Sequence, residues 1–191
     1  MAQTAQSSSI GAYTYSDNKE LFEIQRGNNF EFVIDSSLNG ISAFGSSTKT
    51  FPNAQEYIRL SVHSAPALHY QINPITVSRG NTQVKYAGVP QFNAGSLVVK
   101  DFIGAETKDI LMAWQAQAAN PLTQTVGQQK DYKVTANLIE YTPDYSQIVR
   151  TWQIDGCWVS DVSESDFSVD ENGERRVTAT IQYDRAYPVY E

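Results

Sequence analysis

The residues that could do chemistry are few and far apart in this sequence. His63 and His69 have no Asp or Glu at a spacing that would complete a zinc triad or orient a general base. Cys157 is the single cysteine, which excludes an internal disulfide and a cysteine-cluster metal site. Because it stands between Gly156 and Trp158, we expect a small buried apolar residue rather than a reactive thiol.

An acidic run over residues 166–174 has the charge of a calcium loop but not its pattern. Glu171 stands where such a loop needs a glycine, and no bidentate Glu follows at the right distance. We expect a solvated hairpin on Asn172 and Gly173, with calcium as the alternative. The sequence has no glycine-rich phosphate loop, no Gly-x-Ser-x-Gly turn and no His-Glu-x-x-His. It therefore predicts no catalytic residue, no cofactor and no metal site.

Three tryptophans are the remaining candidates for a binding site. Trp114, Trp152 and Trp158 could form a platform for a sugar. Two of them lie in predicted strands and one lies on the apolar face of a predicted helix, so core packing is the favoured interpretation. A β-sandwich that binds carbohydrate or mediates adhesion remains an alternative function.

Composition and charge narrow the function classes further. The 191 residues suit one domain, and 41% hydrophobic with 18% charged residues is typical of a β-rich globular protein. Of the net charge of −7, residues 155–191 contribute −6, from nine acidic residues and three arginines. This excess of acidic residues argues against a protein that binds nucleic acid through its phosphates. We see neither an apolar run of about 20 residues nor a signal peptide, and we expect a chain without a membrane span.

Period-2 patterns predict most of the elements that would position these residues. We expect an N-terminal arm over residues 1–29 and one domain over residues 30–191, with a long loop at 36–55 and a helix at 106–119. The predicted strands are residues 30–34, 56–63, 68–77, 82–87, 96–102, 132–141, 147–154, 159–167 and 175–184. The expected fold is mainly β, an antiparallel β-sandwich or barrel of about eight strands with one packed α-helix.

The order of these elements resembles the tail tube proteins of contractile-tailed bacteriophages. The resemblance runs from Phe30 to Pro188, and its most specific parts are Lys85-Tyr86-Ala87-Gly88, the helix with Trp114, and Ile181-Gln-Tyr-Asp184. The fold of that family is similar to that of the inner-tube proteins of type VI secretion systems. The N-terminal arm, the loop at 36–55 and the connector at 122–130 depart from the family pattern.

The resemblance implies a structural virion protein that forms homohexameric rings, with its inner sheet completing a barrel shared between subunits. Stacked rings would form a tail tube, the conduit for DNA ejection, assembled in the host cytoplasm. Implied partners are other copies of the chain, the tail sheath, baseplate and tape-measure proteins, and genomic DNA that passes without specific binding. The alternatives are a protein that starts or ends the tube and the inner tube of a secretion or bacteriocin particle.

Seven residues are our candidates for roles in such a tube. Within the 36–55 loop, Ile41, Phe44 and Phe51 are apolar enough to contact the next ring, unless the loop packs on its own domain. A lumen that passes DNA should be neutral or acidic, because unpaired Lys and Arg would hold the phosphates. As polar positions on strands of the barrel, the candidates to line it are Gln83, Lys85, Ser96 and Asp101.

Overall fold

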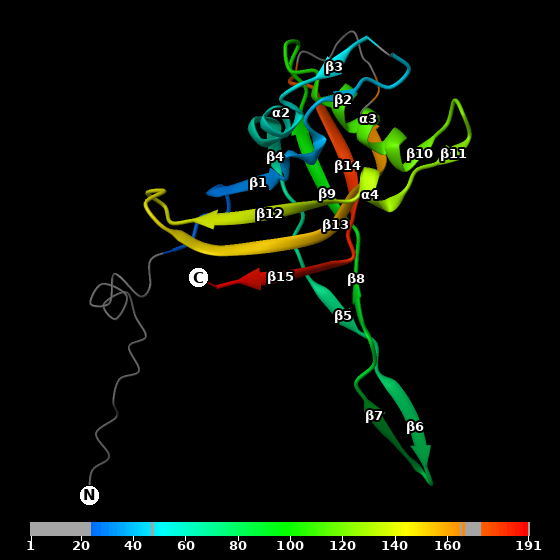
Figure 1. Cartoon of the computed structure of the whole chain (residues 1–191). Helices are drawn as coiled ribbons and strands as arrows, with labels where there is room; N and C mark the ends of the chain where they lie inside the picture. Colours follow the sequence, from blue (N-terminus) through cyan, green and yellow to red (C-terminus); the bar gives the residue numbers. More distant parts are fainter. Residues whose placement is uncertain (1–23, 47, 165, 167–172, 191) are drawn as a thin grey trace, which may run out of the picture.

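The computed structural model describes residues 24–46, 48–164, 166 and 173–190 (Figure 1). Most of the predicted N-terminal arm, and most of the acidic run with its calcium alternative and its Asn172-Gly173 turn, lie outside these residues.

One antiparallel sheet of seven strands forms the body. It follows the order β1-β12-β13-β14-β9-β4, and β15 adds to β13. The bounds are β1 (Phe30–Ile34), β4 (Val62–Ser64), β9 (Gly95–Lys100), β12 (Val134–Tyr141), β13 (Ile148–Glu164), β14 (Arg176–Gln182) and β15 (Arg185–Val189). The first half of β13 pairs with β12 and β15, and its second half pairs with β14. The long β13 therefore belongs to both halves of a curled sheet, and the mainly β, antiparallel fold class is confirmed.

Gly156 marks the place where β13 turns from one half to the other. Val134 pairs with Cys157 and Ala136 with Ile154, so β13 has one extra residue there, as in a β-bulge. Gly156 has a φ of +67°, and a Cβ at this position would lie 2.2 Å from Oδ2 of Asp184. Both restrictions favour glycine at the corner.

We expect Gly156→Ala to lower the free energy of unfolding by about 1–3 kcal/mol, because it adds left-handed strain and displaces the Asp184 carboxylate. That carboxylate is held by Nζ of Lys133 at 2.8 and 2.9 Å. Chemical denaturation measures the change. Gly104→Ala is the control, since Gly104 has no heavy atom within 4 Å of the added Cβ. Equal stabilities of the two variants would contradict the assignment of strain to the corner.

The core lies between the sheet and two helices. Alternate strand residues point inward, and helix α3 (Thr107–Ala118) covers them with Ile110, Leu111 and Trp114. The indole Nε1 of Trp114 donates to the carbonyl oxygen of Tyr132 at 2.8 Å. The predicted helix at 106–119 and the core position of Trp114 are confirmed.

A second helix stands where we predicted a strand. Residues 56–63 belong mostly to α2 (Ala54–Ser61). Its buried residues Ala54, Ile58 and Ser61 recur at spacings of four and three, which is the helical period, and Leu60 is 68% exposed. The prediction of a strand here was wrong because the period-2 pattern placed Leu60 on the buried side with Ile58.

The long loop at 36–55 has structure of its own. It contains the 3-10 helix η1 (Ser36–Leu38) and the paired strands β2 (Ile41–Ser42) and β3 (Thr50–Phe51). The remaining elements are β5 (Tyr70–Ile72), β6 (Ile75–Arg79), β7 (Thr82–Tyr86), β8 (Pro90–Phe92), β10 (Ala119–Asn120), β11 (Thr125–Val126) and α4 (Gln129–Tyr132).

Candidate assembly surfaces

Strands β5 to β8 form one extended hairpin, residues 70–92, that leaves the body (Figure 1). β6 pairs with β7 around a two-residue turn in which Gly80 has a φ of +61°. At about 3.3 Å per residue, the ten residues from Tyr70 to the tip span roughly 30 Å. The predicted hairpin is confirmed, but its position outside the body was not foreseen.

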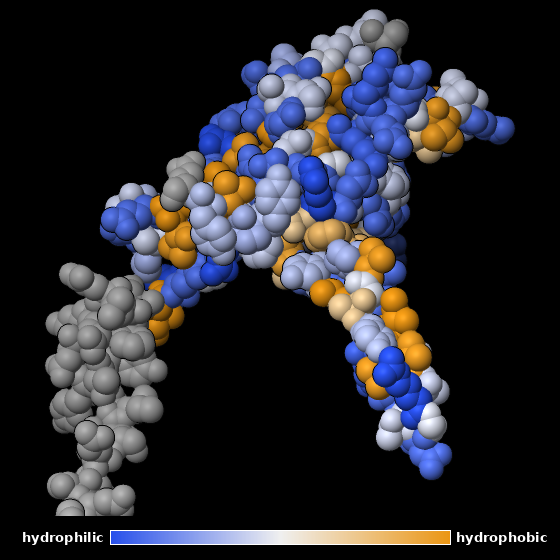
Figure 2. Space-filling view, turned by 60° about the horizontal axis from the view of Figure 1, so that its bottom comes forward, coloured by the Kyte–Doolittle hydropathy of each residue, from blue (hydrophilic) through white to orange (hydrophobic). Residues whose placement is uncertain are grey.

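Apolar side chains of the extended hairpin face solvent, and those of β6 and β7 lie on one face, where Ile75 pairs with Tyr86 and Val77 with Val84. Every residue of β5 and β6 is exposed, and Figure 2 shows apolar patches along the projection. The exposed apolar residues are Tyr70, Ile72, Ile75, Val77, Tyr86 and Val89. An exposed surface of this kind marks a site of contact with another molecule.

The base of the extended hairpin is held firmly to the body. Ring centroids of Phe92 lie 5.9 Å from Tyr70 and 6.1 Å from Tyr183, which is on the body. Gly95 allows Pro66 to approach so closely that a Cβ on Gly95 would lie 2.2 Å from Cβ of Pro66. The hairpin is therefore presented at a defined angle to the body.

The extended hairpin is also basic, in a protein that is acidic. Residues 70–92 contain Arg79 and Lys85 and no acidic residue, which gives +2. Since the whole chain has a net charge of −7, the rest of it carries −9. The surface thus combines apolar side chains with positive charge, which suits a protein surface that is apolar or acidic.

Three strands of the main sheet have an open edge among the residues described. β1 pairs only with β12, β4 only with β9, and β15 only with β13. Between the β1 and β4 edges lies a cleft of about 550 Å³, lined in part by Phe30, Val62 and His63. Unpaired strand edges are available to pair with another chain.

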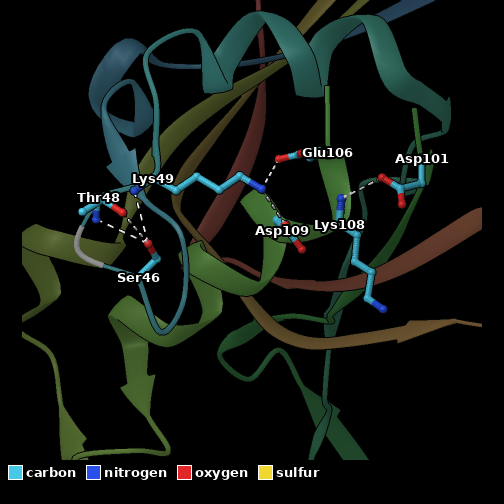
Figure 3. A network of polar contacts seen from close by, with 7 residues as sticks. All are labelled: Ser46, Thr48, Lys49, Asp101, Glu106, Lys108 and Asp109. Carbon is cyan, nitrogen blue, oxygen red and sulfur yellow. Dashed lines mark hydrogen bonds and ion pairs between the residues drawn. The ribbon is translucent and has the colours of Figure 1, made fainter. Parts of the chain in front are cut away.

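A polar network fixes the end of the body opposite the extended hairpin (Figures 1 and 3). Lys49, beside β3, pairs with Glu106 and lies 3.2 Å from Oδ2 of Asp109 at the start of α3. Asp101 accepts a hydrogen bond of 3.2 Å from the backbone N–H of Lys108. Between these contacts, the exposed Phe102 and Ile103 are held on a short loop.

Glu164 lies between two cations at the same end. Nζ of Lys108 is 2.5 Å from its Oε1, and Nε of Arg175 donates to its Oε2 at 3.0 Å. Hydrogen bonds from Lys108 and then Arg175 lower the pKa of the Glu164 carboxyl below its usual 4.5.

This lowered pKa makes the contribution of Glu164 sensitive to acid. The stabilisation is present above the unfolded pKa of 4.5 and is lost as the pH falls through the lower folded value. We expect Glu164→Gln to cost about 1 kcal/mol of unfolding free energy at neutral pH. The difference from the unsubstituted protein should shrink as the pH is lowered below 4.5, in urea melts at several pH values. Asp131→Asn, on an exposed residue of α4, is the control, and a pH-independent difference would contradict the interpretation.

An apolar groove runs between α3, the β10–β11 hairpin and the loop after β2. Its volume is about 420 Å³, and its apolar lining is Phe44, Met112, Ala116, Ala119, Pro121 and Val126. Both chain segments that build it, residues 36–48 and 110–129, contain no charged residue. Depletion of charge with exposed apolar and amide groups is typical of the centre of a protein interface.

The structure separates the three residues predicted to reach the next ring. Ile41 and Phe51 pair across β2 and β3, and with 6% and 4% of their surface exposed they belong to the core of their own domain. Phe44 is partly exposed and lines the groove. For Ile41 and Phe51 the alternative of a loop packed on its own domain holds, because the loop closes on α2 and α3. The contact with the next ring stays a prediction for Phe44.

The four candidates for the lumen lie in three different settings. Gln83 and Lys85 are on β7, which among the described residues pairs with β6 and not with the main sheet, so their place in the lumen stays a prediction. Asp101 directly follows β9, and its carboxylate accepts a hydrogen bond from the backbone N–H of Lys108 in the first turn of α3. Ser96 is exposed on β9, opposite Thr180 of β14, and belongs to a polar outward face of the main sheet.

The candidates for chemistry stay apart. Within the described part of the chain, no three His, Cys, Asp or Glu side chains gather where they could hold a metal ion. Cys157 is buried, and burial raises the pKa of its thiol. Trp114 is fully buried and cannot contribute to an exposed platform with Trp152 and Trp158. In the same described ranges, we find no helix long and apolar enough to span a membrane.

Comparison with solved structures identifies the fold. A chain of the sheath-tube complex of an extracellular contractile injection system, PVC, in its extended state matches with a TM-score of 0.60. The match covers 94% of this chain and 97% of the other, at 13% identity. This is the fold of contractile tube proteins.

Other structures with the tube fold match as well. The tube-terminating cap of the anti-feeding prophage has a TM-score of 0.59 at 13% identity, over 88% of this chain and 92% of that one. Hcp1 from Salmonella typhimurium has a TM-score of 0.43 at 12% identity, over 83% and 84%. No family model and no curated protein sequence matches the chain. The matches to the PVC and anti-feeding prophage structures confirm, at the level of the fold, the resemblance to tube proteins stated from the sequence.

Proposed function

We propose that this protein is a structural subunit of the tube of a contractile particle, and not an enzyme. The observation that supports this most is the match over 94% of the chain to a chain of a sheath-tube complex, in a molecule with open sheet edges. An open edge is an aggregation hazard for a monomer. In a closed ring, each edge finds a partner on the neighbouring subunit.

The proposed assembly is a homohexameric ring, with the rings stacked into a hollow tube. The outward face of β9 and β14, with Ser96, Thr178 and Thr180, would belong to the wall of the lumen, and α3 would lie on the other side of the sheet. Such a face offers hydroxyl groups, and its two cations, Lys100 and Arg176, both pair with Glu174. A wall of this kind would let a polymer such as DNA pass without binding it, as we expect of a neutral or acidic lumen.

We also propose what the tube transports and which kind of particle it belongs to. From the resemblance to phage tail tubes, we propose a conduit for DNA ejection, assembled in a host cytoplasm with sheath, baseplate and tape-measure proteins. The matches to an injection system and to a tube-terminating cap favour a second candidate, an injection-particle tube or its terminator, in which the cargo could be protein.

Electron microscopy of the purified protein tests the proposal. We expect rings with sixfold symmetry at high concentration, and tubes when rings stack. Single rings that never elongate would favour the terminator over the main tube subunit. A protein that stays monomeric at high concentration, even with sheath and baseplate proteins added, would refute a tube role.

A further inference from the structure

We propose that the groove between α3 and the β10–β11 hairpin receives the extended hairpin of a second copy of this chain. The inference rests on the proposed tube function and names the surface that joins one ring to the next. The contact would be heterologous, because the hairpin and the groove are different surfaces of the same molecule. A heterologous contact that joins one ring to the next without closing allows a stack to grow.

The positions of the two surfaces suit head-to-tail contact. The extended hairpin and the β10–β11 hairpin lie at opposite ends of the molecule and on the same side of it (Figure 1). A second copy displaced along the direction of the extended hairpin would bring its groove towards the hairpin tip. The two surfaces lie too far apart in one molecule for the hairpin to fill the groove of its own chain.

The two surfaces also match in chemistry. The aliphatic side chains of Ile75 and Val77 on the hairpin are 57% and 42% exposed. The groove offers them Phe44, Met112 and Val126. Because the groove is built from two charge-free segments, burying it leaves no charge without a partner.

Electrostatic complementarity points to the same pairing. Asp109 precedes Met112 by three residues on α3, so it lies on the same helix face as the groove lining. Its side chain is 48% exposed. Beside its contact with Lys49, it therefore offers a half-exposed carboxylate at the border of the groove to Arg79, which lies on the same hairpin face as Ile75 and Val77. The sheath or another protein could use the same groove, and the experiment below separates these occupants.

Site-directed cross-linking tests the contact directly. The chain has one cysteine, Cys157, which is fully buried, so new cysteines are the only accessible thiols on the described surface. The test variant combines Val77→Cys in the hairpin with Val126→Cys in the groove. The control combines Val77→Cys with Ser146→Cys, an exposed residue of the turn between β12 and β13 that lies outside the groove. After assembly, a short bis-maleimide is added and the products are separated on a denaturing gel.

We expect a ladder of covalent oligomers from the Val77–Val126 pair, at least tenfold more intense than from the control pair. Tubes in the micrographs without this ladder would overturn the groove assignment and leave the tube function standing. If neither tubes nor a ladder forms, both proposals fail. A groove occupied by sheath protein would give a cross-link to sheath and no ladder.

A second variant tests the groove without cross-linking. Ala116→Arg places a long charged side chain in the groove, and Ser146→Arg is the matched control in the exposed turn between β12 and β13. We expect Ala116→Arg to keep the melting temperature within a few degrees and the rings intact, and to raise the protein concentration needed for tubes at least tenfold. Tube formation by Ala116→Arg at the same protein concentration as by the unsubstituted protein would overturn the proposal. Should Ala116→Arg fail to fold, the cross-linking result decides.

Discussion

Shortening the extended hairpin should abolish tubes and leave the subunit folded. We would replace residues 75–86 with an Asn-Gly turn, which keeps the β5–β8 base and its contacts with the body. If only two of the exposed apolar side chains are buried on stacking, the loss at about 1.5 kcal/mol each is roughly 3 kcal/mol. This corresponds to about a hundredfold weaker association. Sedimentation and electron microscopy measure the loss of tubes.

The matched control keeps the hairpin length and changes only its polar positions. Thr76→Ser and Gln83→Asn alter exposed polar side chains of β6 and β7 and should stack normally. Thermal melting should show that the shortened protein is as stable as the parent, because β6 and β7 bury nothing in the body. Tubes of normal length from the shortened protein would contradict a role of the hairpin in stacking.

Serine substitutions in the loop at 36–55 should have opposite effects at neighbouring positions. Phe51→Ser and Ile41→Ser each remove a buried side chain and should cost about 3–5 and 2–5 kcal/mol of unfolding free energy. Phe44→Ser changes a partly exposed residue and should cost about 1 kcal/mol or less. Urea denaturation measures all three.

The same variants also separate folding from assembly. Phe44→Ser should fold, form rings and stack poorly, because Phe44 lines the groove. Ile41→Ser and Phe51→Ser should lose tubes only as far as they lose folded protein. A folded, stable Phe51→Ser variant would show that β3 contributes little to the core, against its burial.

The sequence predicted those elements whose partners lie within the chain. Strands β9, β12 and β14 alternate buried and solvent-facing residues, so their pattern indicates both the strand and its inner face. Helix α3 has its apolar residues at helical spacing. For α2, the short stretch around Ile58 fits both the strand period of 2 and the helical period of 3.6. Its packing against the rest of the subunit stabilises the helix.

The candidate site could be predicted only in part, for a physical reason. An apolar residue can be buried either in the core of its own subunit or against a neighbouring subunit. The sequence therefore does not distinguish Ile41, Phe44 and Phe51. The alternation in β6 and β7 predicts strands, but nothing in it says that both faces stay exposed. The groove joins segments about seventy residues apart, and its only sequence signal is the lack of charge in both.

The continuity of β13 has a mechanical consequence for a subunit that bears load. A pull along this strand passes the corner at Gly156 through peptide bonds, whereas two sheets joined only by side-chain packing could be pulled apart there. Neighbouring strands flank β13 on both halves, so the same pull shears many ladder hydrogen bonds at once. A pull across the strand would instead open these bonds one after another. The molecule is therefore stiffest along β13 and weakest across it.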